Sequence, residues 1–448
     1  MICSDSRSDY TEIRGPCSVL FFIKRRKQMM ISAFVWSSLI VGLISGLLAL
    51  EHPQFKEFSN RTIIQHNDLL ERNRSTSRFD KPPKLYGVAL GGWLVLEPYI
   101  TPSLFNDTVE ETVDEYTLCH KLGKQKATEV LKKHWSTFIT ESDIIKIKNV
   151  GLNSVRIPIG YWAYDLLEDD PYIQGQDEFL SQCIDWCAKH GLSVWIDLHG
   201  APSSQNGFDN SGRRGRAGWQ DEQRYIDKTL YVLETIAKRH GNKSNVIGIE
   251  ILNEPFGPVL NIEKLKQFYQ KGITVIRNTG YSKDIVISDA FQGIFYWNDF
   301  QPSDSNLILD RHHYEVFSDG QLRSSFEGHL RGIEAFGRAI AIEKPTVVVG
   351  EWSAAITDCA PWVNGAGRPS RYHGMVLEDG TVGDCSGATN IEQWAGKRRE
   401  EFLKIIETSL KAYNAADGWF FWCWKTESAL EWDMEKLLHY TLFPSGWV

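Results

Sequence analysis

The sequence lacks several features that point to particular classes of fold or partner. It has no basic surplus, because 49 Lys and Arg residues stand against 57 Asp and Glu residues, for a formal net charge of −8. Nucleic acid is therefore not expected as a partner, since binding phosphates requires a basic face. The spacing of its eight cysteines matches no zinc site. No Gly-x-Gly-x-x-Gly turn follows the first apolar run, which disfavours an open doubly wound sheet.

Aromatic residues, by contrast, are abundant. The chain has 16 Trp, 16 Tyr and 22 Phe residues. Flat aromatic faces pack well against the apolar faces of sugar rings, so this composition is compatible with a carbohydrate ligand. The alternative is that the aromatic side chains fill a large core.

The N-terminal part of the chain has the pattern of a targeting segment. Residues 1–28 form a polar tail that ends in a basic run, and residues 29–50 form an apolar stretch about as long as a membrane span. Two interpretations remain open, a signal-anchor and a cleaved signal peptide. Residues 51–83 are polar and are interpreted as a linker or stalk, which leaves 84–448 as the folded domain.

Asn-x-Ser/Thr triplets support entry into the secretory pathway. They lie after the apolar stretch, at Asn60, Asn73, Asn106 and Asn242. We therefore expect a secreted protein or, if residues 29–50 are retained as an anchor, a type II membrane protein with the folded domain outside. One or two disulfides are plausible in that compartment.

From residue 84 the sequence alternates between short apolar runs and longer stretches with helical periodicity. The predicted strands are 85–93, 154–160, 193–200, 246–253, 284–290, 307–314, 346–352 and 419–425. The predicted helical stretches are 124–148, 176–190, 222–239, 263–279, 324–342 and 390–414. The runs are continuously apolar, as strands buried on both faces should be. This alternation predicts an α/β fold, a closed (β/α)8 barrel of the TIM type.

Two glutamates follow buried runs at the predicted mouth of the barrel. Glu254 follows the fourth run and Glu351 ends the seventh. Catalytic groups of such barrels lie at the C-terminal ends of the strands. Two facing carboxyl groups suffice for glycoside hydrolysis, with one as proton donor and the other as nucleophile or base. The alternative is a pair of unrelated rim glutamates in salt bridges with Arg156 or Lys425.

The motifs around these glutamates resemble glycoside hydrolase family 5. The resemblance rests on Asn253-Glu254-Pro255 and Gly350-Glu351-Trp352. It is closest to the fungal exo-β-1,3-glucanases of that family and covers about residues 84–444. The other matching stretches are 90–99, 155–162, 195–200, 204–212 and 289–292.

The resemblance implies a role for each glutamate. Glu254 would be the general acid/base and Glu351 the nucleophile of a reaction that retains the anomeric configuration. The carboxyl groups should then lie about 5–5.5 Å apart. In the resting enzyme Glu254 should be protonated and Glu351 ionised.

The resemblance also implies supporting roles. Arg156 would keep Glu351 ionised, Tyr314 would donate a hydrogen bond to it, and Asn253 would bind the sugar 2-hydroxyl. His199 and His312 would line the sugar pocket, and Glu97 and Trp424 would grip the terminal glucose. Phe208 and Phe317 would clamp the next glucose. Tyr99 and Asp209 lie within the matching stretches and are also predicted to support the site. No cofactor is implied. A metal site at His312 and His313 is not expected, because neighbouring strand residues point to opposite faces.

The chain also departs from the family pattern. Arg311 stands where the family has a further histidine, and we expect it to point away from the sugar. The usual disulfide partners of Cys359 and Cys385 are absent, so these two either pair with each other or stay free. The loop 213–218 is more basic and glycine-rich than the resemblance implies.

The resemblance favours release of glucose from the non-reducing ends of β-1,3-glucan in fungal cell-wall remodelling, by a monomer, with transglucosylation as an open further reaction. An endo-acting β-glucanase or mannanase on the same barrel is one alternative. A non-catalytic glucan-binding wall protein is the other, because a fold alone does not imply activity.

Overall fold

A computed structural model of the chain describes residues 83–106, 112–300, 302, 304, 306–374, 382–444 and 446. The predicted basic tail, the apolar stretch 29–50 and nearly all of the predicted linker lie outside the described residues. None of the helices within the described ranges combines the length and apolar character that a membrane crossing requires.

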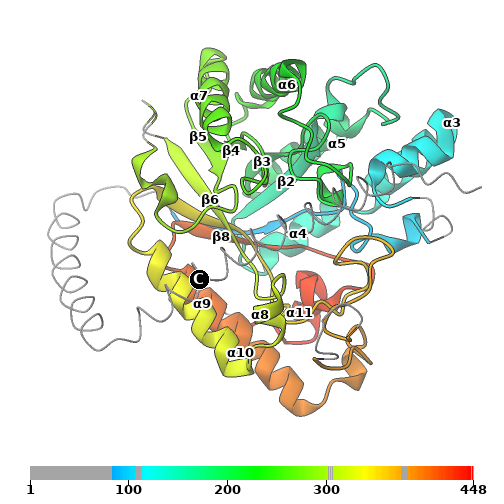
Figure 1. The fold of residues 1–448 in the computed structure, drawn as a ribbon, viewed down its shortest axis with the longest axis vertical. Coiled ribbons are helices and arrows are strands. Elements are labelled where there is room, and N and C mark those ends of the chain that lie inside the picture. The colour runs from blue at the N-terminus through cyan, green and yellow to red at the C-terminus, as the bar shows by residue number, and fades with distance from the viewer. Residues whose placement is uncertain are drawn as a thin grey trace, which may run out of the picture. The chain divides into compact units, whose positions relative to one another are not determined.

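The described residues form a closed barrel of parallel strands in sequence order, with helices around it (Figure 1). This confirms the predicted fold. The strands are β1 (Leu85–Ala89), β2 (Ser154–Gly160), β3 (Ser193–Gly200), β4 (Val246–Glu250), β5 (Asp284–Ser288), β6 (Leu307–His313), β7 (Thr346–Trp352) and β8 (Gly418–Phe421). The pairing of β1 with β8 closes the barrel.

Helices follow the strands around the outside. They are α3 (Glu115–Thr137), α4 (Glu141–Asn149), α5 (Gln176–His190), α6 (Gln223–His240), α7 (Ile262–Asn278), α8 (Asp319–Leu322), α9 (Phe326–Ile340), α10 (Gly396–Tyr413) and α11 (Met434–His439). The 3-10 turns are η1 (Pro102–Leu104), η2 (Tyr161–Ala163), η3 (Asp209–Ser211), η4 (Tyr296–Asp299), η5 (Ile391–Gln393) and η6 (Leu430–Trp432).

The predicted single helix over 124–148 is wrong. Two helices, α3 and α4, cover this region, and α3 begins earlier than predicted. Thr140 is the reason for the break, because its backbone N–H and hydroxyl both donate to the Asp143 carboxylate, 2.8 Å away. This capping-box arrangement starts a new helix. The predicted strands in β1, β4 and β8 are also too long, since each continues into loop.

Side chains that point out of the barrel build the main core. Ile196 and Leu198 of β3, for example, are fully buried in a large cluster with the surrounding helices. Outward residues are therefore apolar along the strands, which explains why the runs read as continuously apolar in sequence.

Side chains that point inward change character along the strands. On β3 the inward residues are Trp195, Asp197 and His199 in turn, and on β6 they are Ile308, Asp310 and His312. Near the N-terminal ends of the strands lies an apolar level, made of Trp195, Val286, Ile308, Val348 and Phe420. Next comes a charged level, made of Arg156, Asp197, Glu250 and Asp310, which are all fully buried. At the C-terminal ends lies the site level, with His199, Glu254, His312 and Glu351.

Candidate active site

Glu254 lies just beyond β4, on a backbone held in an uncommon conformation. Its φ is 44°, in the left-handed region that non-glycine residues rarely adopt. Neighbours fix the preceding residue, because the backbone N–H of Asn253 donates to the Leu198 carbonyl and the Gln205 side chain donates to the Asn253 carbonyl, both at 2.9 Å. Backbone strain of this kind is characteristic of functional positions.

Glu351 lies on β7 and is nearly fully buried. The residue before it must be glycine, because a Cβ on Gly350 would lie 2.0 Å from Asp310 Oδ1. That space is taken by the Asp310 carboxylate, which accepts a 2.7 Å hydrogen bond from the Gly350 backbone N–H. The Gly-Glu-Trp motif thus brings the charged level close under the carboxyl group of Glu351.

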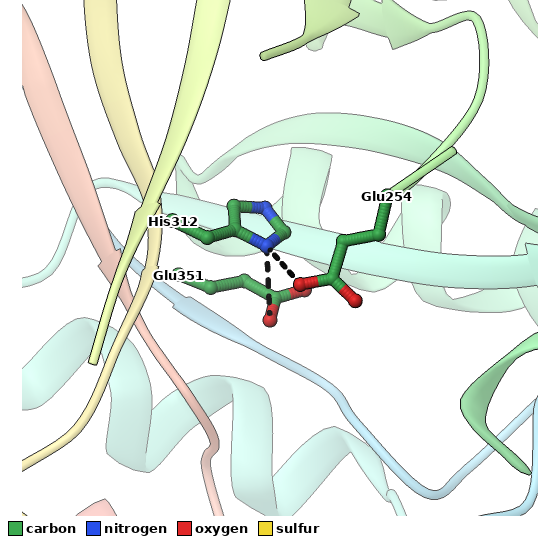
Figure 2. A group of neighbouring side chains, drawn as sticks. All are labelled: Glu254, His312 and Glu351. Carbon is green, nitrogen blue, oxygen red and sulfur yellow. Dashed lines mark hydrogen bonds and ion pairs between the residues drawn. The ribbon is translucent and has the colours of Figure 1, made fainter. Parts of the chain in front are cut away.

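The two glutamates meet at one imidazole ring (Figure 2). His312 Nδ1 lies 2.8 Å from Glu254 Oε1 and 3.4 Å from Glu351 Oε2. An oxygen of each carboxyl group lies within 4.8 Å of the other. This separation is shorter than the roughly 6.5–9.5 Å of inverting glycosidases and matches the retaining arrangement.

Arg156 connects the charged level to Glu351. Its Nη1 donates to Glu351 Oε1 at 2.6 Å, and its Nε and Nη2 donate to Glu250 Oε2 at 3.1 and 2.9 Å. Nη2 also donates to Asn253 Oδ1 at 2.9 Å and lies 3.2 Å from Asp197. The proposed alternative of a salt bridge to Lys425 does not occur, because Lys425 pairs with Asp143 instead.

The pKa directions differ from the predicted protonation states. Burial raises the pKa of Glu351 above its usual range, and the charges of His312 and Arg156 offset this only in part. Burial also acts on Glu254, but hydrogen bonds from His312 and Asn210 outweigh it and lower its pKa. These two directions run against the expectation that Glu254 holds the proton and Glu351 is ionised, whereas the donors to both oxygens of Glu351 favour its ionised form.

His312 lowers the pKa of both glutamates. Burial disfavours its charged form, but Glu351 and Asp310 outweigh burial and raise its pKa well above the usual value. Both ring nitrogens face carboxylates, since Nε2 lies 3.2 Å from Asp310 Oδ2. A histidine that donates from both nitrogens is an imidazolium. Both contacts therefore favour a protonated ring beside Glu254.

The other predicted polar residues surround this pair. Tyr314 Oη donates to Glu351 Oε2 at 2.7 Å, so the expected hydrogen bond is present. His199 Nδ1 lies 2.6 Å from Asp197 Oδ2, and its Nε2 lies 3.4 Å from Asn253 Nδ2. Glu97 is buried, and one of its carboxyl oxygens has no hydrogen-bond partner among the described residues. Burial, followed by the charge of Asp209, raises the pKa of Glu97 well above its usual range.

Asp209 and the clamp residues lie at the rim. Asp209 opens the short 3-10 turn η3, directly after Phe208, and burial raises its pKa to about 6. Phe208 and Phe317 are 38% and 46% exposed, which leaves part of each aromatic side chain open to a ligand. Phe317 packs edge-on against Tyr314, with ring centroids 5.3 Å apart.

The prediction that Trp424 lines the pocket is wrong. Trp424 is buried against α4, where its Nε1 donates to Asp143 Oδ1 at 3.2 Å. Trp422 lies in the site instead, because its ring stacks on His199 with centroids 5.5 Å apart and its Nε1 donates to Tyr99 Oη at 2.6 Å. The strand β8 ends at Phe421, so strand alternation no longer decides where the following residues point.

Some residues of the site were not predicted. Asn210 Nδ2 donates to Glu254 Oε2 at 3.0 Å. Phe256 and Phe291 pack with Phe208 at centroid distances of 5.4 and 6.2 Å. Phe291 also lines a cavity of about 260 Å³ that reaches Glu254 and His312. Asn210 lies inside the matching stretch 204–212, which was the one available signal for it.

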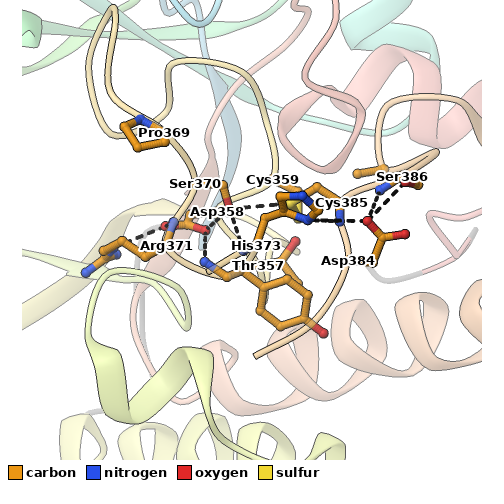
Figure 3. The surroundings of a disulfide bond; sticks show 12 residues. Thr357, Asp358, Cys359, Pro369, Ser370, Arg371, His373, Asp384, Cys385 and Ser386 are labelled. Atoms are coloured by element: carbon orange, nitrogen blue, oxygen red, sulfur yellow. Dashed lines mark hydrogen bonds and ion pairs between the residues drawn. A yellow bond between two sulfur atoms is a disulfide. The ribbon is translucent and has the colours of Figure 1, made fainter. Parts of the chain in front are cut away.

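The departures from the family pattern are accommodated. Arg311 points away from the two glutamates, as expected, and pairs with Asp289 at 3.0 Å and Glu343 at 2.5 Å. Cys359 and Cys385 pair with each other, and this disulfide lies in the segment that follows β7 (Figure 3). Within the loop 213–218, Arg214 Nη1 donates to the Ala366 carbonyl at 2.8 Å.

Among the described residues, Glu254, His312 and Glu351 could offer a set of ligands to a cation. Arg156, 2.6 Å from Glu351, would oppose a cation there. His312 and His313 face opposite sides, since His313 Nδ1 lies 2.7 Å from Tyr413 Oη on α10. The geometry supports acid–base and nucleophilic chemistry by two carboxyl groups.

Comparison with known proteins gives consistent matches. The model of the family "Cellulase (glycosyl hydrolase family 5)" matches residues 119–428. A glucan 1,3-beta-glucosidase of Schwanniomyces occidentalis is 47% identical over 372 residues, covering 81% of this chain and 87% of that protein. Glucan 1,3-beta-glucosidase 2 of Wickerhamomyces anomalus is 43% identical over 432 residues, covering 93% and 97%.

Solved structures support the same fold. A rutinosidase from Aspergillus niger superimposes with a TM-score of 0.63 at 22% identity, covering 80% of this chain and 98% of that one. The structure of AoRut superimposes with a TM-score of 0.65 at 22% identity, covering 80% and 96%. At this level of identity the likeness concerns the barrel alone.

Proposed function

Because the chain belongs to glycosyl hydrolase family 5, we propose that it removes glucose from the non-reducing ends of β-1,3-glucan with retention of configuration. The observation that carries the mechanism is the pair of carboxyl groups within 4.8 Å of each other across His312. The relatives named glucan 1,3-beta-glucosidase support the choice of substrate.

In the first step Glu351 attacks the anomeric carbon and forms a glucosyl ester. Arg156 and Tyr314, which donate to opposite oxygens of Glu351, orient its carboxylate for this attack. Burial leaves the Glu351 carboxylate poorly solvated, which raises its pKa. Forming the ester removes this poorly solvated charge. As the glycosidic bond breaks, the leaving oxygen takes a proton from the carboxylic acid of Glu254.

The proton supply involves two residues. His312 carries a proton 2.8 Å from Glu254 Oε1, and transferring it produces the carboxylic acid that protonates the leaving oxygen. In the second step Glu254, again a carboxylate, accepts a proton from water, and that water attacks the glucosyl ester and releases β-glucose. A sugar acceptor in place of water would give transglucosylation.

The pocket residues have complementary roles in this scheme. Glu97 has a buried carboxyl oxygen without a hydrogen-bond partner among the described residues, and a hydroxyl of the terminal glucose would satisfy it. Trp422 supplies a buried aromatic face beside His199. The exposed rings of Phe208 and Phe317 would hold the next glucose unit.

We extend the proposal to the setting of the enzyme. The apolar stretch 29–50 and the sequons support a secreted or membrane-tethered monomer that acts on the fungal cell wall. Cleavage of the apolar stretch can be checked by N-terminal sequencing of the mature protein.

Product analysis tests the proposed function. Purified protein is incubated with β-1,3-glucan, β-1,4-glucan and mannan, and products are followed by mass and by NMR of the anomeric proton. Glucose alone from the β-1,3-glucan, formed first as the β-anomer, supports the proposal. A ladder of oligosaccharides points to endo action, and binding without any product points to a glucan-binding protein.

A further inference from the structure

The segment that follows β7 contacts the backbone beneath one of the exposed clamp rings. Arg371 Nη2 donates to the Val316 carbonyl at 3.2 Å and Nη1 donates to the Phe317 carbonyl at 3.1 Å. Nη1 also lies 3.3 Å from Asp319 Oδ1 at the start of α8. A planar guanidinium that holds neighbouring carbonyls fixes the main chain on which the Phe317 ring is carried.

Arg371 is itself held by a buried aspartate. Asp358 is almost fully buried, and its Oδ2 accepts from the backbone N–H and the Nε of Arg371 at 2.9 and 3.1 Å. Its Oδ1 accepts from Ser370 Oγ at 2.6 Å and from the Tyr372 backbone N–H at 2.9 Å. These bonds leave Arg371 little freedom to turn away from Phe317.

The disulfide lies next to this aspartate (Figure 3). Cys359 follows Asp358 directly and is bonded to Cys385, whose Sγ lies 3.3 Å from Ser370 Oγ. The disulfide therefore links the residue next to Asp358 to Cys385, which lies beside Ser370, a hydrogen-bond donor to Asp358.

The same segment also contacts the loop that carries the other clamp ring. Arg214 lies in the connection between β3 and α6, which also carries Phe208. Its Nη1 donates to the Ala366 carbonyl at 2.8 Å. One segment thus contacts the supports of both Phe208 and Phe317. A shift of this segment would therefore move the supports of both rings.

We propose that Arg371, anchored by Asp358 beside the Cys359–Cys385 disulfide, is a positioning residue that sets Phe317 against Phe208 for binding the leaving-group glucose. This inference rests on the proposed function, because it assigns the clamp to the glucose next to the scissile bond. It predicts an effect that depends on the leaving group. Substrates with a glucose leaving group need the clamp, whereas β-glucosyl fluoride, whose leaving group is a single atom, does not.

The test compares these two substrates in the full-length chain. We expect R371M to raise KM for a β-1,3-linked glucose trimer about tenfold while kcat/KM for β-glucosyl fluoride stays within about twofold of the wild type. R371K keeps one donor and should recover part of the loss. The double variant C359S/C385S should shift KM for the trimer in the same direction, by a smaller factor.

R277M is the matched control. Arg277 also holds backbone carbonyls, those of Tyr281, Lys283 and Asn306. It lies at the C-terminal end of α7, before β5 begins, whereas both clamp rings follow the C-terminal ends of strands. It should leave the ratio between the two substrates unchanged. Should R371M fail to fold, R371K and the double cysteine variant are judged by the same ratio.

Equal losses on both substrates, or no loss on the trimer, would overturn the positioning role. The wild type separates this result from failure of the proposed function. If the wild type hydrolyses the fluoride but not the trimer, the proposed β-1,3-glucan specificity is wrong, and with it the inference.

Discussion

The two ends of the barrel interior hold different kinds of side chain, although the same strands supply them. At the apolar level, Trp195 and Phe420 pack edge-on with centroids 5.1 Å apart, and none of the defining side chains is polar. Two residues further along β3 the inward side chain is Asp197, and two residues beyond that it is His199. The apolar level contributes packing energy, whereas the levels above it hold buried charge.

Buried charge is stable here because each group has a partner. Burial disfavours the charge on Arg156, but Asp197, Glu250 and Glu351 outweigh it and raise its pKa further. Burial raises the pKa of Glu250 well above its usual range, and the charge of Arg156 opposes this rise only in part. The comparison teaches that changes at the charged and site levels should affect chemistry, and changes at the apolar level should affect stability.

The largest expected effect is a loss of catalysis when the site level is changed. E351Q keeps the shape of the nucleophile and removes its charge, so kcat should fall by at least about 10⁴-fold while oligosaccharide binding persists. Single-turnover kinetics and calorimetric binding measure the two quantities. E315Q, at a glutamate that pairs with His313 and His329, is the control and should retain activity. Turnover near the wild-type value in E351Q would rule out the nucleophile.

The next largest expected effect is a loss of stability when the apolar level is changed. F420A deletes a fully buried ring at the apolar level, so the free energy of unfolding should fall by about 3–5 kcal/mol. Urea unfolding measures this loss. The folded fraction should keep kcat/KM within about twofold, and a large loss of kcat/KM in folded protein would show that the levels are not independent.

His312 sharpens the comparison through pH. Its pKa is raised, so the proton that it supplies is present at low pH and is lost only as pH rises through that raised value. H312Q removes this source, leaving Glu254 alone to donate. The alkaline limb of kcat/KM should therefore move to lower pH, with activity above that limb about a hundredfold lower. H313Q is the control, and an unchanged limb in H312Q would contradict the proton relay.

The smallest expected effect comes from Tyr314. Y314F removes one hydrogen bond to Glu351 Oε2 and should lower kcat about tenfold, with little change in melting temperature. Y281F, which removes a hydroxyl that donates to the Asp284 carbonyl, should leave kcat unchanged. A loss above about a thousandfold in Y314F would mean that the phenol takes part in the reaction directly.

Most of the barrel could be predicted because burial on both faces leaves a continuous apolar signal. The runs 154–160, 193–200 and 346–352 coincide with β2, β3 and β7. The predicted ends of β1, β4 and β8 are wrong because apolar loop residues such as Leu90 and Ile251 are buried as fully as strand residues. A burial pattern cannot mark where the backbone leaves the sheet.

The two glutamates could be predicted from motifs, whereas their protonation could not. It depends on His312 and Asn210, which approach from other loops and strands, and no sequence spacing reports those contacts. The choice between Trp422 and Trp424 failed for a similar reason. Both follow the end of β8, where only the path of the chain decides which ring faces the site.

Trapping the covalent intermediate tests the central claim most directly. The protein is incubated with 2-deoxy-2-fluoro-β-glucosyl fluoride. Its 2-fluorine slows both steps, but the fluoride leaving group keeps formation of the ester fast, so the ester accumulates and is mapped by peptide mass spectrometry. Our account predicts one fluoroglucosyl group on Glu351 and loss of activity in step with its formation. An adduct on another residue, or turnover to 2-deoxy-2-fluoro-α-glucose without any adduct, would contradict it.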